Sequence, residues 1–259
     1  MASPGCQVRF VRYSERIMTT HLAMWSGPRN LSTALMRSFG SRPDATVSDE
    51  PLYAHYLKAT GKPHPMTEEI LRDQENDWRI VVDELRGPIP GGRTLWYQKH
   101  MAHHLLPDMG REWLEGLEHA FLIREPRAVV ASLLAKLESV ELEDTGLPQQ
   151  VELFRREAER TGRTPAVVDA ADILRDPERT LSSLCARLGL EFTRRMLQWE
   201  KGPRDTDGCW GPYWYANTYE STGFGPPRES RAVVPAEYEE LALRCEELYA
   251  ELAEHKITL

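Results

Sequence analysis

The sequence has no long apolar run. Of its 259 residues, 28% are charged and 41% are hydrophobic, and no stretch approaches the roughly 20 consecutive apolar residues of a membrane-spanning helix. Residues 1–17 also lack the apolar segment of a secretory signal. We therefore expect a soluble, cytoplasmic protein with no membrane partner. Residues 1–17 are a candidate disordered extension, Met18 is a candidate start, and residues 18–259 are expected to form one domain.

Cysteine is scarce and never paired in the sequence. The four cysteines lie far apart, without a C-x-x-C pair, which disfavours both a zinc site and a disulfide framework. No group of carboxylates or cysteines has the spacing typical of metal ligands. We therefore expect reduced thiols and no metal.

A basic excess is also missing. The formal net charge of −8 disfavours non-specific binding to nucleic acid, which needs a broad basic surface. An anionic ligand would have to meet a local cluster of cations. We expect a small-molecule ligand and no nucleic-acid partner; the oligomeric state is not readable from the sequence.

Short apolar segments alternate with helical patterns along the chain. Strands are predicted at residues 22–25, 45–47, 94–98, 121–123 and 166–168, and apolar residues at helical spacing follow several of them. Strands that alternate with helices indicate a parallel sheet covered on both faces. The predicted fold class is α/β, with three layers (α/β/α) around a central, mostly parallel sheet.

Three further segments complete this outline. One helix is predicted over residues 67–85 and an amphipathic helix over residues 237–254. Residues 201–227 are rich in Gly, Pro, Trp and Tyr and read as a long loop. Loops of that length are usually functional lids or disordered segments, and the aromatic residues favour a lid.

A polar turn follows the first predicted strand. It runs from Ser26 to Thr33 and leads into a helix, a position where backbone N–H groups and the helix dipole attract an anion. Arg29 adds a positive charge, and Ser32 and Thr33 add hydroxyls. The segment lacks the Gly and Lys of a Walker A loop, which disfavours ATP or GTP hydrolysis. Alone, it would fit an ordinary helix cap equally well.

A second polar pair follows the strand predicted at 121–123. Arg124 stands at the strand end, and Ser132 lies eight positions later, two turns into the next helix. Both side chains can therefore converge on one phosphate. Taken alone, Arg124 could instead be a surface ion-pair partner.

These segments resemble the donor site of sulfotransferases that use 3′-phosphoadenosine 5′-phosphosulfate (PAPS). The family's 5′-phosphosulfate loop, usually P-R-S-G-T-T, is matched in register by Pro28, Arg29, Asn30, Leu31, Ser32 and Thr33. Its 3′-phosphate motif, an Arg eight residues before a Ser, is matched by Arg124 and Ser132. The basic K-G pair that closes over the 3′-phosphate is matched by Lys201 and Gly202, with Arg204 as an assisting cation. Leu31 departs from the family, which usually has glycine there.

The resemblance covers most of residues 22–202 in the family's order. It implies a P-loop-type fold, PAPS as donor, PAP as product, and an acceptor with a hydroxyl or amine group. Two other functions stay open. One is a nucleotide or small-molecule kinase on the same scaffold. The other is a catalytically weak nucleotide-binding relative, because Leu31 replaces the usual glycine of the phosphate loop.

Two segments offer a general base for the acceptor. Some sulfotransferases use a glutamate after the second strand, which would be Glu50, and Lys99 resembles the family lysine near the bridging oxygen. The branch that acts on small molecules uses a histidine in K-T-H, where this chain has Met101 with His100 and His104 nearby. We rank Glu50 above His104 and His100, although capping and structural roles would also explain these residues.

Overall fold

A five-stranded parallel sheet forms the centre of the molecule. The computed structural model describes residues 19–227 and 233–258, so the extension expected at 1–17 and Met18 lie outside the described residues. The strand order is β2-β3-β1-β4-β5, and every neighbouring pair is parallel. The strands are β1 (Thr20–Ser26), β2 (Ala45–Asp49), β3 (Leu95–Met101), β4 (Glu118–Ile123) and β5 (Ala166–Asp169).

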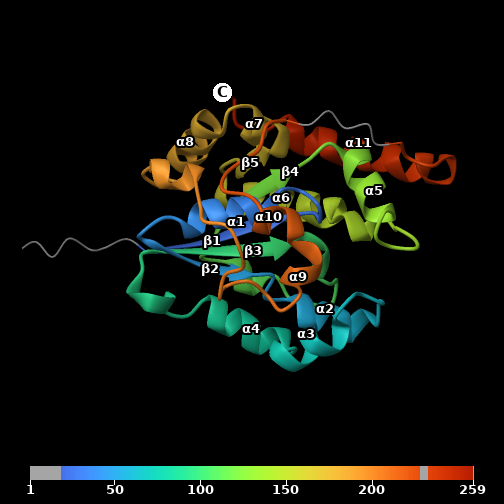
Figure 1. Ribbon diagram of the computed structural model, residues 1–259, viewed down its shortest axis with the longest axis horizontal. Coiled ribbons are helices and arrows are strands. Elements are labelled where there is room, and N and C mark those ends of the chain that lie inside the picture. Colours follow the sequence, from blue (N-terminus) through green and yellow to red (C-terminus); the bar gives the residue numbers. More distant parts are fainter. Residues whose placement is uncertain (1–18, 228–232, 259) are drawn as a thin grey trace, which may run out of the picture.

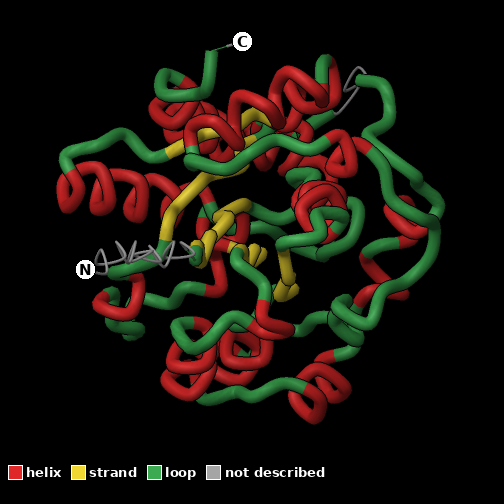
Figure 2. Tube along the Cα trace, turned by 90° about the vertical axis from the view of Figure 1, so that its left-hand side faces the viewer, coloured by secondary structure: helices red, strands yellow, loops and turns green. Residues whose placement is uncertain are grey.

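Helices cover both faces of this sheet (Figures 1 and 2). The helices α1 (Ser32–Gly40), α7 (Ala170–Arg175) and α8 (Pro177–Arg187) pack on one face. The other face is covered by α4 (Trp78–Leu85), α5 (Pro126–Leu134), α6 (Leu147–Thr161) and α11 (Glu239–Ala253). Alternate residues of β1 enter the two cores, Leu22 and Met24 on one side and Ala23 and Trp25 on the other, which explains why the strand reads as a continuous apolar run. The predicted three-layer α/β fold is confirmed.

None of the helices in the described parts of the chain is both long and apolar enough to cross a membrane.

The strand predicted at 94–98 extends further than expected. β3 continues through Lys99, His100 and Met101, and all of its residues are buried. The extra residues pair with the end of β1, so that Lys99 lies beside Met24 and His100 beside Trp25. Lys99 and His100 therefore point to opposite faces of the sheet.

The single helix expected over 67–85 was wrong, because the segment forms α3 (Thr67–Asp73) and α4 with an extended break between them. Gln74 leaves helical geometry, and its side chain accepts a hydrogen bond from Ala54 N at 3.1 Å and donates one to Glu50 O at 3.3 Å. Asp77 then caps α4 by accepting a bond from Arg79 N at 2.9 Å. The break thus supports the turn that carries Glu50.

Residues 201–227 are more structured than a long loop. They contain α9 (Gly211–Trp214) and α10 (Ala216–Tyr219), and Trp210 and Tyr215 are buried against α2 (Tyr53–Thr60). The central part of the segment is therefore packed against the rest of the domain. The movement of residues 201–227 as a lid stays a prediction. The C-terminal helix expected at 237–254 is confirmed as α11.

Candidate active site

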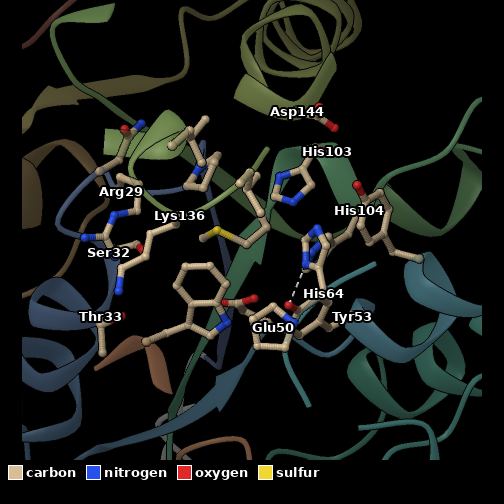
Figure 3. Close-up of a pocket in the computed structure, with 18 of the residues that line it drawn as sticks. Arg29, Ser32, Thr33, Glu50, Tyr53, His64, His103, His104, Lys136 and Asp144 are labelled. Carbon is tan, nitrogen blue, oxygen red and sulfur yellow. Dashed lines mark hydrogen bonds between the residues drawn. The ribbon is translucent and has the colours of Figure 1, made fainter. Parts of the chain in front are cut away.

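A cavity of about 790 Å³ lies at the carboxyl ends of the strands. Ligands bind at this edge in open parallel α/β sheets. The loop after β1 lines one end of the cavity, and Glu50 and Arg124, which follow β2 and β4, also line it. Tyr53, His64, His103 and His104 line the other end (Figure 3).

The loop between β1 and α1 has an unusual backbone. Arg29 and Leu31 adopt positive φ angles of 63° and 68°, a left-handed conformation that costs a non-glycine residue free energy and is typical of functional sites. The loop also packs tightly, because a Cβ at Gly27 would collide with the carbonyl oxygen of Thr145. Leu31 thus holds a conformation that a glycine would adopt without strain.

Among the other loop residues, Pro28, Ser32 and Thr33 line the cavity. Asn30 also lines it, but its side-chain Nδ2 donates to Leu122 O at 3.3 Å. Asn30 therefore ties the loop to β4 through its side chain.

Arg29 and Arg124 line the loop end of the cavity, and Ser132, which does not line it, lies beside Arg29. Arg29 Nε donates to Ser132 Oγ at 2.9 Å, and Arg124 donates to the carbonyl oxygen of Arg29. Burial lowers the pKa of both arginines, and the pKa of Arg124 is lowered further by its neighbour Arg29. Within residues 19–227 and 233–258, neither guanidinium forms an ion pair with a carboxylate. Two adjacent cations that lack an ion-paired carboxylate in this part of the chain suit a polyanionic ligand.

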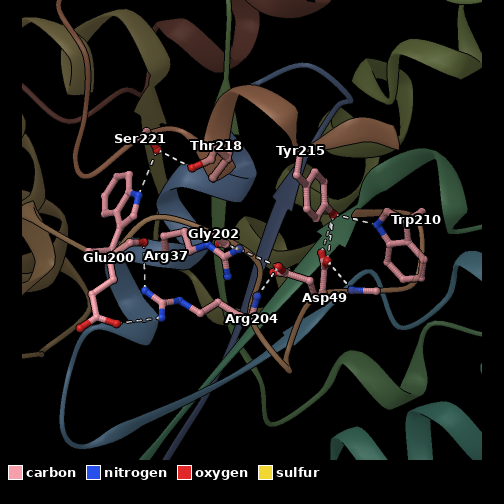
Figure 4. Close-up of polar contacts among 12 residues, drawn as sticks. Arg37, Asp49, Glu200, Gly202, Arg204, Trp210, Tyr215, Thr218 and Ser221 are labelled. Carbon is pink, nitrogen blue, oxygen red and sulfur yellow. Dashed lines mark hydrogen bonds and ion pairs between the residues drawn. The ribbon is translucent and has the colours of Figure 1, made fainter. Parts of the chain in front are cut away.

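Lys99 is the centre of a buried polar network. Its Nζ donates to Asp49 Oδ1 at 2.8 Å, to Glu50 Oε1 at 2.6 Å and to Tyr215 OH at 2.7 Å. The Lys99 and Asp49 side chains are each only 1% exposed. Tyr215 OH also contacts Asp49 at 2.9 Å and accepts from Trp210 Nε1 at 2.8 Å (Figure 4). All three protons of the Lys99 ammonium are therefore engaged.

The backbone fixes Glu50 beside this lysine. Asp49 is the register partner of Lys99 in the neighbouring strand, and Glu50 N donates to Lys99 O at 3.0 Å. Glu50 also adopts a left-handed φ of 44°, a strained geometry that recurs at functional sites.

Burial makes Glu50 a stronger base than an ordinary carboxylate. Burial raises the pKa of Glu50, while the Lys99 ammonium acts in the opposite direction. Burial alone would lower the pKa of Lys99, but Asp49 and Glu50 reverse this and raise it. The hydrogen bonds from Lys99 and Tyr215 both reach Glu50 Oε1, and in the described part of the chain none reaches Oε2. A carboxylate with a raised pKa that lines a cavity can accept a proton from a bound ligand.

The structure separates the two histidines proposed as bases. His100 does not line the cavity: its ring stacks on Trp25 at a centroid distance of 4.5 Å in the core, because β3 continues past it and turns it to the opposite face from Lys99. Burial lowers its pKa to about 3. His104 does line the cavity, stacked on Tyr53 at 4.7 Å, and burial lowers its pKa well below the usual value. Both imidazoles are therefore neutral and weakly basic.

The structure does not bring Lys201, Gly202 and Arg204 to the cavity. Lys201 Nζ pairs with Glu220 at 3.4 Å, and Arg204 pairs with Glu200 at 3.4 Å. Arg37 holds their segment in place (Figure 4) by donating to Gly202 O at 3.4 Å and to Asp207 at 2.6 Å, in a pair whose side chains are both 4% exposed. Lys201 and Arg204 are therefore both engaged by glutamates in this arrangement, and their closure over the 3′-phosphate stays a prediction.

Several cavity residues were missed at the level of sequence. Tyr215 was recognised only as one aromatic residue of the segment 201–227, and nothing in the sequence connects it with Lys99. Tyr53 and His64, which share a hydrogen bond of 2.8 Å (Figure 3), follow no recognisable motif. In the parts of the chain that the structure describes, no group of three or more His, Cys, Asp or Glu side chains could hold a metal ion.

Two curated plant proteins resemble this chain over most of its length. Branched-chain-amino-acid aminotransferase-like proteins 2 and 1 from Arabidopsis thaliana are each 38% identical to it, over 226 and 232 residues. The matches cover 87% and 89% of this chain but only 40% and 41% of those proteins. The chain therefore spans about two fifths of the length of these relatives.

A structural comparison and a family sequence model both match this chain to sulfotransferase domains. The sulfotransferase domain from the Synechococcus PCC 7002 olefin synthase superposes with a TM-score of 0.58 and 19% identity, over 90% of this chain and 96% of that one, a likeness that concerns the fold alone. The sequence model of the sulfotransferase domain matches residues 20–244. With most of its residues inside that match, the chain belongs to the sulfotransferase family.

Proposed function

We propose that this chain transfers a sulfuryl group from PAPS to a hydroxyl or amine of a small acceptor and releases PAP. The observation that carries the proposal is that Arg29 and Arg124 line one end of the cavity that Glu50 and Lys99 also line, with Ser132 bound to Arg29 beside it. This places candidate anion-binding groups and a candidate base in one space. A cavity of about 790 Å³ is within the usual size range of ligand sites.

The basic end of the cavity is proposed to bind the donor. The loop of Pro28 to Thr33 and the start of α1 offer backbone N–H groups and the positive end of a helix dipole to the 5′-phosphosulfate. Arg29 adds a charged donor there, and Arg124 and Ser132 bind the 3′-phosphate. The Arg29–Ser132 hydrogen bond supports this assignment, because it joins side chains of the two predicted phosphate motifs.

Glu50 is proposed to act as the base in the transfer step. The acceptor oxygen or nitrogen forms a bond to sulfur, the bond between sulfur and the 5′-phosphate oxygen breaks, and PAP leaves with that electron pair. The proton of the acceptor passes to Glu50. Lys99 positions Glu50 and keeps a positive charge beside the reaction, and it can reach a leaving oxygen only by exchanging one of its three present hydrogen bonds.

The donor can be identified by thermal shift. PAP should raise the melting temperature by binding the folded state, whereas a kinase on the same scaffold would respond to ATP. A response to ATP and none to PAP would contradict the proposed function.

The 3′-phosphate assignment predicts that Arg124→Ala and Ser132→Ala weaken PAP binding. Charge-assisted hydrogen bonds are worth roughly 1.5 to 3 kcal/mol each, so Arg124→Ala should reduce affinity about tenfold to a hundredfold. Ser132→Ala should have a smaller effect in the same direction. Calorimetric titration with PAP and AMP measures both, with Arg127→Ala as control, since Arg127 pairs with Glu239 outside the cavity. Equal binding of PAP and AMP by the wild type would contradict this assignment.

A further inference from the structure

The donor proposed above carries more charge than the predicted site residues can offset. PAPS has about four negative charges, counting both phosphate-bearing ends. Arg29 and Arg124 supply two positive charges at the cavity. Lys99 cannot be counted with them, because Asp49 and Glu50 more than neutralise its ammonium. Lys201 and Arg204 lie outside the cavity, each paired with a glutamate. A further cation at the donor end would correct this imbalance.

Lys136 occupies a suitable position for that cation. It follows the end of α5, where Lys136 N donates to Leu133 O at 2.8 Å, and it lies one helical turn beyond Ser132. Its side chain lines the cavity and points into it on the same side as Arg29 and Ser32 (Figure 3). Within the described chain, no carboxylate pairs with its ammonium, whose aromatic contact is the ring of Tyr213, 5.2 Å from Nζ to the centroid.

We propose that Lys136 is this further cation and binds the phosphates of the donor. This inference rests on the proposed function. An exposed contact between an ammonium and a tyrosine ring is weaker than a charge-assisted hydrogen bond to a phosphate. The ammonium can therefore leave the Tyr213 ring when a phosphate enters, and its flexible stem allows the change without moving the backbone.

The test is a titration of PAP into the wild type, Lys136→Gln and Lys201→Gln. Loss of one charged phosphate contact at an exposed position should reduce affinity about tenfold in Lys136→Gln. The loss in Lys201→Gln should be smaller. Lys136→Arg should keep most of the affinity because it retains the charge. Lys58→Gln is the matched control, since Lys58 is an exposed lysine that binds Asn76 away from the cavity.

The outcomes separate this inference from the proposed function. Wild-type affinity for PAP in Lys136→Gln would overturn the inference alone, and a larger loss in Lys201→Gln would return the role to Lys201. A wild type that does not bind PAP would overturn the proposed function and this inference with it. If Lys136→Gln binds PAP more weakly, the wild type and this variant are then titrated with AMP and with adenosine 3′-phosphate. The ligand whose affinity falls assigns Lys136 to the 5′ or the 3′ end of the donor.

Discussion

Glu50→Gln is expected to bind PAP like the wild type and to transfer the sulfuryl group at least about a hundredfold more slowly, since loss of a general base typically costs 10² to 10⁴ in rate. The amide keeps an oxygen that can accept from Lys99, so the network around the site persists. The measurements are a PAP titration and labelled-sulfate transfer to an acceptor identified by screening metabolite classes.

The pH dependence provides a second measurement on the same variant. Glu50 must be ionised to accept a proton, and burial raises its pKa above the ordinary value for glutamate. The wild-type rate should therefore fall as the pH drops through this raised pKa, and Glu50→Gln should lack that limb. Near-normal turnover in Glu50→Gln, together with loss of turnover in His104→Ala, would instead assign the chemistry to the histidine.

Lys99→Met is expected to lower the free energy of unfolding by about 3 to 5 kcal/mol, because it leaves Asp49 and Glu50 buried without their cation. Removal of the ammonium also raises the pKa of Glu50 further, since Lys99 is the charge that lowers it. A carboxyl whose pKa is higher in the folded state destabilises the fold when ionised, and this cost fades as the pH falls through the folded-state pKa. The deficit of Lys99→Met should therefore be larger at pH 8 than at pH 5 in urea unfolding.

The control for this variant is Lys256→Met. Lys256 pairs with Asp172 at 2.9 Å but is 41% exposed, and exposed pairs contribute about 0 to 1 kcal/mol. A deficit in Lys99→Met that is no larger than in Lys256→Met, or that grows as the pH falls, would contradict the interpretation of a buried, cation-dependent pair.

The sheet could be predicted because its strands are buried on both faces. β1 and β4 read as apolar runs between turns, and a parallel sheet brings the ends of both strands to one edge. That geometry alone places Arg29 and Arg124 together, as observed. The helix break at Gln74 was not predictable from apolar spacing, since it depends on hydrogen bonds to Ala54 and Glu50.

The missed parts of the site depend on contacts between distant segments. His100 looked accessible because the strand was expected to end before it, and only pairing with β1 shows that the strand continues. Lys201 matched a motif, but the sequence does not show that an ion pair of Arg37 with Asp207 holds the neighbouring segment, and the role of Lys201 stays a prediction. Lys136 belongs to no motif, and its relevance appears only when the walls of the cavity are known.

The Lys99 network joins parts of the chain that are synthesised far apart. Tyr215 lies 116 residues from Lys99 and 166 from Asp49 along the chain, whereas the last strand of the sheet ends at Asp169. Long-range contacts form slowly because loop closure has to precede them. We therefore expect the sheet to assemble first and the base to reach its final hydrogen bonding last. The protein would then become catalytically active only when these last hydrogen bonds form. A compact folding intermediate that lacks them would be inactive.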